Sequence, residues 1–152
     1  MKYFSAALVA LILTGCQKFN IVNVTKENGN VVFSNEKIIS TCTKSIYIYD
    51  FEVKYINSDG ADTVWMLVRS TQPNPEHTSF DFPLIYGESV IDVNTTIEAS
   101  TLKSGLYKLG ATLSCLTTDG DKSITLIGIF AIDKDNNLIT NQDEISRIES
   151  QI

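Results

Sequence analysis

The chain has 152 residues, with 12 basic and 18 acidic side chains, one histidine and three cysteines. This length is sufficient for one ordinary domain with a hydrophobic core. A formal net charge of −6 argues against a nucleic-acid partner, because binding to phosphates needs a concentrated cationic surface. One histidine and three cysteines leave little material for a zinc site or a catalytic triad, so composition favours a protein that is not an enzyme and holds no cofactor.

The N-terminal segment has the pattern of a secretory signal peptide. Lys2 supplies a basic start, and residues 3–13 form an apolar run about half as long as the ~20 residues that a membrane-spanning helix needs. Small residues follow, as they do before the cleavage site of a signal peptide. We therefore expect residues 1–15 to be removed, which leaves residues 16–152 with 11 basic and 18 acidic side chains, a net charge of −7.

The four residues at the end of the apolar run, Leu13-Thr14-Gly15-Cys16, resemble the lipobox of bacterial lipoproteins. The resemblance implies that diacylglycerol is attached to the sulfur of Cys16, that the chain is cut before Cys16, and that residues 16–20 form a lipidated tether. Two or three acyl chains would hold the protein stably on a bilayer that it does not cross. The alternatives are an ordinary signal peptide with a chance cysteine and a cytosolic protein with an apolar start.

The residue after Cys16 bears on localisation. In lipoproteins, aspartate at this place favours retention at the inner membrane, whereas this chain has Gln17. The resemblance therefore implies the outer membrane, with the protein facing the periplasm. Because the mature chain is acidic, we expect attachment through the acyl chains alone, without broad contact with anionic lipid.

The remaining cysteines are Cys42 and Cys115, an even number of thiols for an oxidising compartment, so we predict a disulfide between them. It would close a loop of about 70 residues, for which the chain-entropy model gives about 4 kcal/mol of stabilisation. Two buried free thiols are the alternative, because the sequence does not show whether the two Cα atoms lie within bridging distance. The two residues are not a CxxC pair, so redox catalysis has no support.

After the tether, short apolar segments alternate with turn residues, a pattern typical of β-strands. Asn28-Gly29 predicts a hairpin between the first two segments. Only the C-terminal end has helical spacing, because Ile145, Ile148 and Ile152 share one helical face after a capping residue, Asn141. The segments predicted as strands are 21–24, 31–33, 46–56, 63–68, 80–82, 84–86, 90–93, 95–97, 107–115 and 123–132, and the predicted helix is 142–150.

Two of these segments predict which side chains are buried. In 46–56 every second residue is apolar or aromatic, so we expect one buried face. That face would consist of Tyr47, Tyr49, Phe51, Val53 and Tyr55. Residues 123–132 are apolar almost throughout, which predicts a strand buried on both sides.

About seven to eight antiparallel strands, separated by turns at fairly regular spacing, predict an all-β fold with a short C-terminal helix. A β-sandwich and a small β-barrel are the two architectures that fit this pattern. No internal repeat or linker interrupts the chain, so we expect residues 21–152 to form a single domain.

Three residues favour the sandwich. Cys42, Trp65 and Cys115 come in the order of the strand-B cysteine, strand-C tryptophan and strand-F cysteine of immunoglobulin domains, and Leu102-x-x-Gly105-x-Tyr107 is similar to the approach to a tyrosine corner. The chain therefore resembles the immunoglobulin and fibronectin type III families over roughly residues 38–132, which implies an immunoglobulin-like β-sandwich. It departs from the immunoglobulin pattern in that Tyr107 lies eight residues before Cys115 instead of two.

The sequence offers weak candidates for catalysis or metal binding. His77 lies near Glu76 and Ser79 in a proline-rich loop, but no nucleophile motif accompanies it, so we predict a solvated loop histidine. A calcium site is the candidate at the C-terminal end, where oxygen-bearing side chains fall at positions 1, 3, 5 and 12 of an EF-hand-like spacing. These residues are Asp133, Asp135, Asn137 and Glu144. Leu138 replaces the glycine of that loop, which favours a hairpin turn and a helix cap over a metal site.

The aromatic residues are expected mainly in the core, because they follow the strand period. As possible recognition residues we select Phe80, Phe82 and Tyr86, which surround the proline loop, since loops at the ends of a sandwich are its usual binding surface. The function expected first is a non-catalytic binding or assembly module whose partner is an unidentified envelope protein. The alternative is an inhibitor or ligand-binding protein that presents the 70–78 loop, and an enzyme is the third hypothesis.

Overall fold

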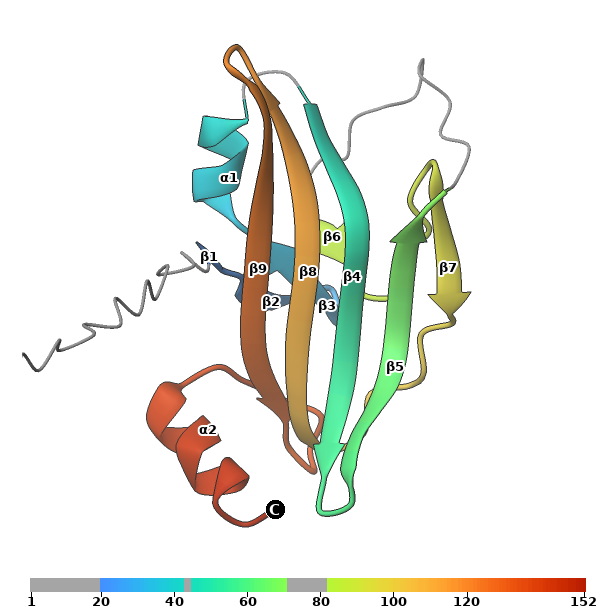
Figure 1. Ribbon diagram of the computed structural model, residues 1–152. Coiled ribbons are helices and arrows are strands. Elements are labelled where there is room, and N and C mark those ends of the chain that lie inside the picture. Colours follow the sequence, from blue (N-terminus) through green and yellow to red (C-terminus); the bar gives the residue numbers. More distant parts are fainter. Residues whose placement is uncertain (1–19, 43–44, 71–81) are drawn as a thin grey trace, which may run out of the picture.

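The computed structural model describes residues 20–42, 45–70 and 82–152, which form ten strands and two helices (Figure 1). Cys16, His77 and Phe80 lie outside the described residues. In chain order the elements are β1 (Asn20–Ile21), β2 (Asn23–Glu27), β3 (Asn30–Ser34), α1 (Glu36–Thr41), β4 (Ser45–Asn57), β5 (Gly60–Arg69), β6 (Leu84–Ile85), β7 (Val93–Ile97), β8 (Gly105–Thr117), β9 (Gly120–Ile132), β10 (Leu138–Ile139) and α2 (Gln142–Glu149).

The strands form two open sheets. The larger sheet has the order β1-β9-β8-β4-β5-β7, with β10 also paired to β9, and the smaller has the order β2-β3-β6. All pairs are antiparallel except that β1 runs parallel to β9. The expectation of antiparallel strands alone is therefore wrong at β1, and the small-barrel alternative is wrong because neither sheet closes on itself.

The two sheets form two layers with the core between them. Figure 1 shows the smaller sheet behind the upper part of the larger one, and α2 beside the lower end of β9. Successive residues of a strand point to opposite faces, so Leu106 and Tyr107 show how both faces of β8 are used. Tyr107 is buried in the core between the sheets, whereas Leu106 packs under Ile145 of α2 on the outer face.

Aromatic side chains dominate the core. Phe33 of the smaller sheet meets Phe51 of β4 at a ring-centroid distance of 5.4 Å, and Phe51 meets Trp65 of β5 at 5.4 Å. Trp65 is fully buried, and Tyr107 stacks on Phe130 at 5.1 Å. Each such side chain contributes about 1.5–3 kcal/mol by its burial alone, so this cluster provides much of the force that holds the layers together.

Strand β4 departs from the expected alternation at Tyr49. Ile48 pairs with Leu113 and Asp50 with Thr112, so Tyr49 is an extra residue, a β-bulge. The bulge shifts the alternation by one residue. Ile46 and Ile48 are buried before it and Phe51 and Val53 after it, while Tyr49 is 42% exposed. The prediction that Tyr49 shares a buried face with Phe51 is therefore wrong.

Two other strands also differ from the expectation. Of the predicted segments 90–93 and 95–97, only Val93–Ile97 forms a strand, β7, because residues 91–92 form a turn in which Asp92 has a positive φ of 60°. In β9, Leu126 and Phe130 are fully buried but Ile127 is 41% exposed. The prediction that β9 is buried on both sides fails at Ile127, where no described element covers the outer face.

The short helix α1 was not expected, and Asn35 explains both its start and its position. The Asn35 side-chain oxygen accepts a hydrogen bond from the Ile38 amide at 3.0 Å, which caps the helix. Its side-chain nitrogen donates to the Ile21 carbonyl at 2.8 Å and so ties β1 to α1. Asn20, the last residue of the predicted tether of residues 16–20, lies in β1 and pairs with Leu126 of β9.

The comparison with immunoglobulin cysteines is corrected by the position of Cys42. This residue is the C-cap of α1 and lies outside the strands, so it does not take the place of a strand-B cysteine. Trp65 and Cys115 lie on β5 and β8 of the same sheet. The C-terminal helix agrees with the prediction, because α2 is capped by Asn141 and buries Ile145, although Ile152 is exposed.

Candidate functional site

A disulfide joins Cys42 to Cys115, with Cα atoms 5.3 Å apart, as predicted. Cys115 is buried on β8, and Cys42 ends α1, so the bond fixes α1 to the larger sheet. Disulfides persist in oxidising compartments and are rare in the cytosol, so the bond indicates an extracytoplasmic domain.

The hydroxyl of Tyr107 closes the loop that leads into β8. It donates a hydrogen bond to the carbonyl oxygen of Lys103 at 2.8 Å and accepts one from the Lys103 amide at 2.9 Å. A tyrosine at the start of a strand that bonds back to the backbone a few residues upstream is the geometry of a tyrosine corner, as the Leu102 to Tyr107 spacing predicts. Burial raises the pKa of the Tyr107 hydroxyl.

Phe82 and Tyr86, two of the three predicted recognition residues, pack into the core. Phe82 is buried, and the Tyr86 ring meets Trp65 edge to face at 5.2 Å. The Tyr86 hydroxyl donates to the Ser100 carbonyl at 2.8 Å, and burial raises the pKa of Tyr86 to about 12. Phe82 and the half-buried Tyr86 therefore both contribute to the packing of the core.

The oxygen-bearing residues considered for calcium serve a turn and a helix end. The carboxylate of Asp133 accepts hydrogen bonds from the amides of Asp135 and Asn137 and from the Asn137 side chain, at 2.7–2.9 Å. The bonds from Asn137 lower the pKa of Asp133. Glu144 lies in the first turn of α2, where its amide donates to the cap Asn141. Within the described residues, no group of three or more acidic, histidine or cysteine side chains is arranged to hold a metal ion.

Glu52, on β4 of the larger sheet, is an acidic residue whose pKa differs from its usual value. Its carboxylate contacts the Lys54 amine at 2.9 Å and accepts a hydrogen bond from the Thr63 hydroxyl at 2.5 Å. Burial raises the pKa of Glu52, but these two hydrogen bonds together outweigh it, so the pKa lies below its usual value. An ionised, paired carboxylate of this kind is suited to a surface contact between strands and not to proton transfer at neutral pH.

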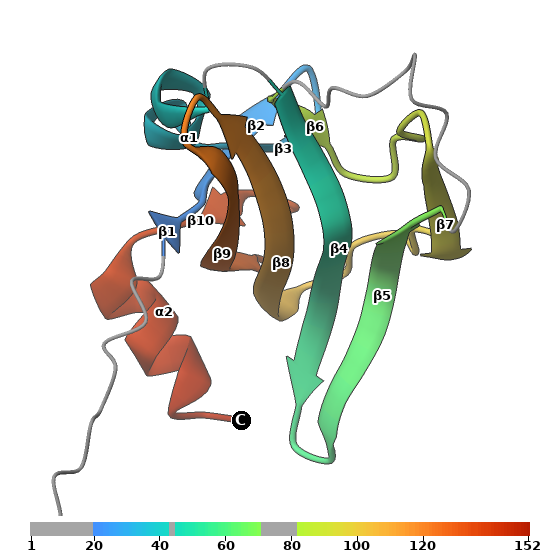
Figure 2. The same ribbon diagram turned by 45° about the horizontal axis from the view of Figure 1, so that its top comes forward.

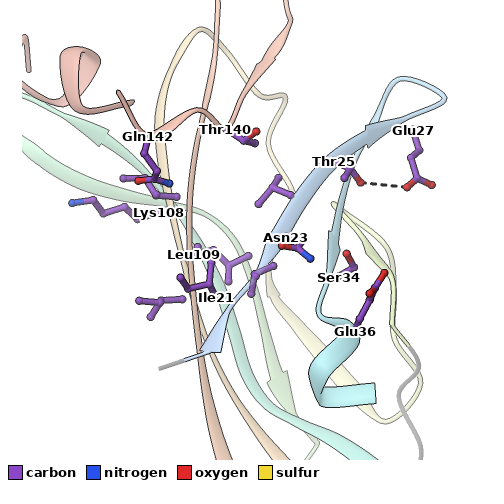
Figure 3. Close-up of a pocket in the computed structure, with 15 residues that line it drawn as sticks. Ile21, Asn23, Thr25, Glu27, Ser34, Glu36, Lys108, Leu109, Thr140 and Gln142 are labelled. Carbon is purple, nitrogen blue, oxygen red and sulfur yellow. Dashed lines mark hydrogen bonds between the residues drawn. The ribbon is translucent and has the colours of Figure 1, made fainter. Parts of the chain in front are cut away.

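An open groove of about 1110 Å³ lies beside β1 (Figure 3). It lies between β2 on one side and β8, β9 and the start of α2 on the other. The groove exists because the chain leaves the larger sheet after β1 and crosses to the smaller sheet as β2. Val22, between the two strands, still donates to the Ile127 carbonyl at 2.9 Å, so this crossing is fixed by the β9 edge.

The lining of the groove combines an apolar floor with a polar rim. The floor includes Val22 and Leu109, which are almost completely buried, and Ile21 and Ile127, which are 72% and 41% exposed. The rim is polar and carries charges of both signs. Its residues are Asn23, Thr25, Glu27, Ser34, Glu36, Lys108, Thr140 and Gln142. Such a surface binds apolar groups along its floor and orients them by hydrogen bonds at its rim.

The sequence reasoning did not select any residue of this groove. Ile127 was read as part of a strand covered on both faces, and Ile21 as part of an ordinary strand. The sequences of β8 and β9 contain one signal for the groove. The outer-face residues of β9 are apolar, whereas those of its neighbour β8, such as Lys108 and Thr112, are polar. This contrast indicates a sheet face that is not fully covered.

No family model, no curated protein and no solved structure matches the chain. In the part of the chain that the structure describes, no helix is both long enough and apolar enough to span a bilayer.

Proposed function

We propose that this protein is a bacterial lipoprotein, anchored through Cys16 to the periplasmic side of the outer membrane, whose domain is a non-catalytic binding or assembly module. The observation that carries the proposal is the Leu13-Thr14-Gly15-Cys16 motif directly after a short apolar run. The Cys42–Cys115 disulfide supports it independently, because a lipobox protein folds outside the cytoplasm, where such bonds persist.

The groove beside β1 supports the binding part of the proposal. It is a large concave surface, and an apolar floor with polar residues around it is the usual form of a ligand-binding surface. A large exposed apolar side chain such as Ile21 at its edge is typical of a surface that is covered in the working protein.

We also propose that the domain is related to immunoglobulin-like sandwiches at the level of fold. Immunoglobulin domains place strands C, F and G together in one sheet and pair B with E in the other. The order β4-β8-β9 and the pairing of β3 with β6 are similar to these arrangements. The tyrosine corner at Tyr107 is a third likeness. Two features differ from the immunoglobulin arrangement: Cys42 lies at the end of α1 outside the strands, and β7, which follows β6 in the chain, pairs with β5 at the edge of the larger sheet.

The proposal is tested by mass spectrometry of the protein purified with detergent from a bacterial envelope. We expect a mature chain that begins at Cys16 and carries a diacylglyceryl group there, and recovery in the detergent phase on phase separation. The Cys16→Ala protein is the matched control and should remain unlipidated. A wild-type chain that keeps residues 1–15, or that starts at another residue, would refute the assignment.

A further inference from the structure

Two exposed isoleucines lie side by side at the edge of the larger sheet. Ile21 of β1 pairs with Ile127 of β9, so their side chains point to the same face. Leu126 and Phe130 point into the core, which places Ile127 on the outer face. Ile129 continues this row toward α2, where it packs against the cluster around Ile145. The outer face therefore carries a continuous apolar strip from β1 to α2.

The strip lies close to the proposed anchor. Only residues 17–19 separate Cys16 from Asn20, the first residue of β1. Four steps of extended chain span at most about 14 Å, so the Cys16 Cα cannot lie farther than that from the Cα of Asn20 at the start of β1. An acylated Cys16 sits at the level of the lipid headgroups, which forces the β1 edge of the domain to stay within the same distance of the bilayer.

We propose that the surface formed by Ile21, Ile127 and the adjoining groove rests on the lipid bilayer next to the anchor, with both isoleucine side chains at the boundary between headgroups and acyl chains, so that lipid is what the groove binds. This inference rests on the proposed lipidation of Cys16. It explains why a 72% exposed isoleucine stands at the end of β1. Contact with lipid would fix the orientation of the domain, with the opposite sheet edge at β7 directed into the periplasm (Figures 1 and 2).

The charges around the strip indicate a neutral lipid surface. Glu27 and Glu36 are the acidic residues in the lining of the groove, and Lys108 in that lining forms an ion pair with Glu149 at 2.8 Å. With no excess of positive charge on the described rim, electrostatic attraction to anionic lipid cannot provide the contact. We expect the contact to depend on apolar burial and on the anchor, and to form equally well on zwitterionic lipid.

The inference is tested by the depth of single tryptophans in vesicles. The native Trp65 is fully buried in the core and gives a constant background. Lipidated Ile21→Trp and Ile127→Trp proteins are reconstituted into phosphatidylcholine vesicles whose acyl chains carry bromine, which quenches nearby tryptophan. The matched control is Ile91→Trp, because Ile91 is 74% exposed and lies just before β7, at the other edge of the sheet. Mass spectrometry of each sample reports the state of Cys16.

We expect the Ile21→Trp and Ile127→Trp proteins to be quenched at least twofold more than the Ile91→Trp protein, with or without anionic lipid. Equal quenching in all three with Cys16 lipidated would overturn the inference and leave the lipoprotein assignment intact. Absence of the lipid from Cys16 would overturn both. Dimerisation of the unlipidated Cys16→Ala protein in sedimentation, lost on Ile21→Glu substitution, would also overturn the inference, because a second copy would then cover the strip. If Ile127→Trp does not fold, the more exposed Ile21 position decides the result.

Discussion

The Tyr107 hydroxyl binds both backbone groups of Lys103, and this pair of bonds fixes the loop before β8. We expect Tyr107→Phe to lower the free energy of unfolding by about 1 kcal/mol, the usual net value of a hydrogen bond whose partners can turn to water. Chemical denaturation monitored by Trp65 fluorescence measures the change. Tyr49→Phe is the control, since Tyr49 is exposed on its bulge, and should change stability by less than about 0.5 kcal/mol. Equal effects of the two substitutions would contradict the structural role of the Tyr107 hydroxyl.

The raised pKa of Tyr86 leads us to predict that the protein loses stability at alkaline pH. Its pKa is about 12 in the folded protein and near 10 in an unfolded chain, so the folded state holds the phenolic proton more tightly. The resulting stability is fully present below pH 10 and is lost as the pH rises from 10 toward 12. Denaturant unfolding at several pH values between about 8 and 11 should therefore show a shallower decline for Tyr86→Phe than for the wild type. Parallel curves for the two proteins would show that Tyr86 does not contribute.

At the scale of elements, the bulge at Tyr49 leads us to predict that this residue can be deleted without unfolding the protein. Without Tyr49, Ile48 and Phe51 are two positions apart, so the strand alternates regularly and every pairing with β8 is kept. We expect the Tyr49 deletion to fold, to form the disulfide and to lose less than about 1.5 kcal/mol of stability.

The contrasting deletion is that of Glu52, also in β4. Removing Glu52 shifts Phe51 to the outer face and brings Asp50 to the core position that Phe51 occupies. The loss should then exceed about 3 kcal/mol, because a large aromatic side chain leaves the core and a carboxylate enters it. Thermal unfolding of the two deletion variants provides the measurement, and a more stable Glu52 deletion would argue against the bulge.

The side-chain amide of Asn35 connects β1 to α1 through two hydrogen bonds, one made by its nitrogen and one by its oxygen. Asn35→Asp keeps the oxygen that caps α1 but replaces the nitrogen that donates to the Ile21 carbonyl. We therefore expect α1 to persist while β1 separates from β9. Hydrogen exchange should accelerate at the Val22 amide, which bonds to Ile127, and remain slow at the Cys42 amide at the end of α1. Equal acceleration at both amides would mean that the substitution loosens the whole region.

At the scale of the whole molecule, the disulfide constrains a loop with a sequence separation of 73 residues. The Cys42→Ala and Cys115→Ala double substitution should lower the free energy of unfolding by about 4 kcal/mol, mainly by giving the unfolded chain more freedom. Equilibrium denaturation compares this variant with Cys16→Ala, which keeps the disulfide and should retain the wild-type stability. A loss below about 1 kcal/mol would show that the layered core holds α1 in place without the bond.

More of the fold than of the candidate site could be predicted from the sequence. The hairpin at Asn28-Gly29, the long strands and the capped C-terminal helix follow from local patterns, and the structure contains all of them. The bulge at Tyr49 and the helix α1 were missed, since a single inserted residue and a six-residue helix leave almost no periodic signal. The groove was missed because its residues come from seven separate elements that only the folded chain brings together.

By itself, the sequence determined the period of the strands, the turn positions, the resemblance of Leu13-Thr14-Gly15-Cys16 to a lipobox and the presence of two further cysteines, because each depends on residues close together in the chain. Only the tertiary structure decided which strands are neighbours, that β1 runs parallel to β9, and that no described element covers the outer face at Ile127. The physical reason is that pairing and burial depend on contacts between distant segments. An apolar side chain has the same local pattern whether another element covers it or leaves it exposed.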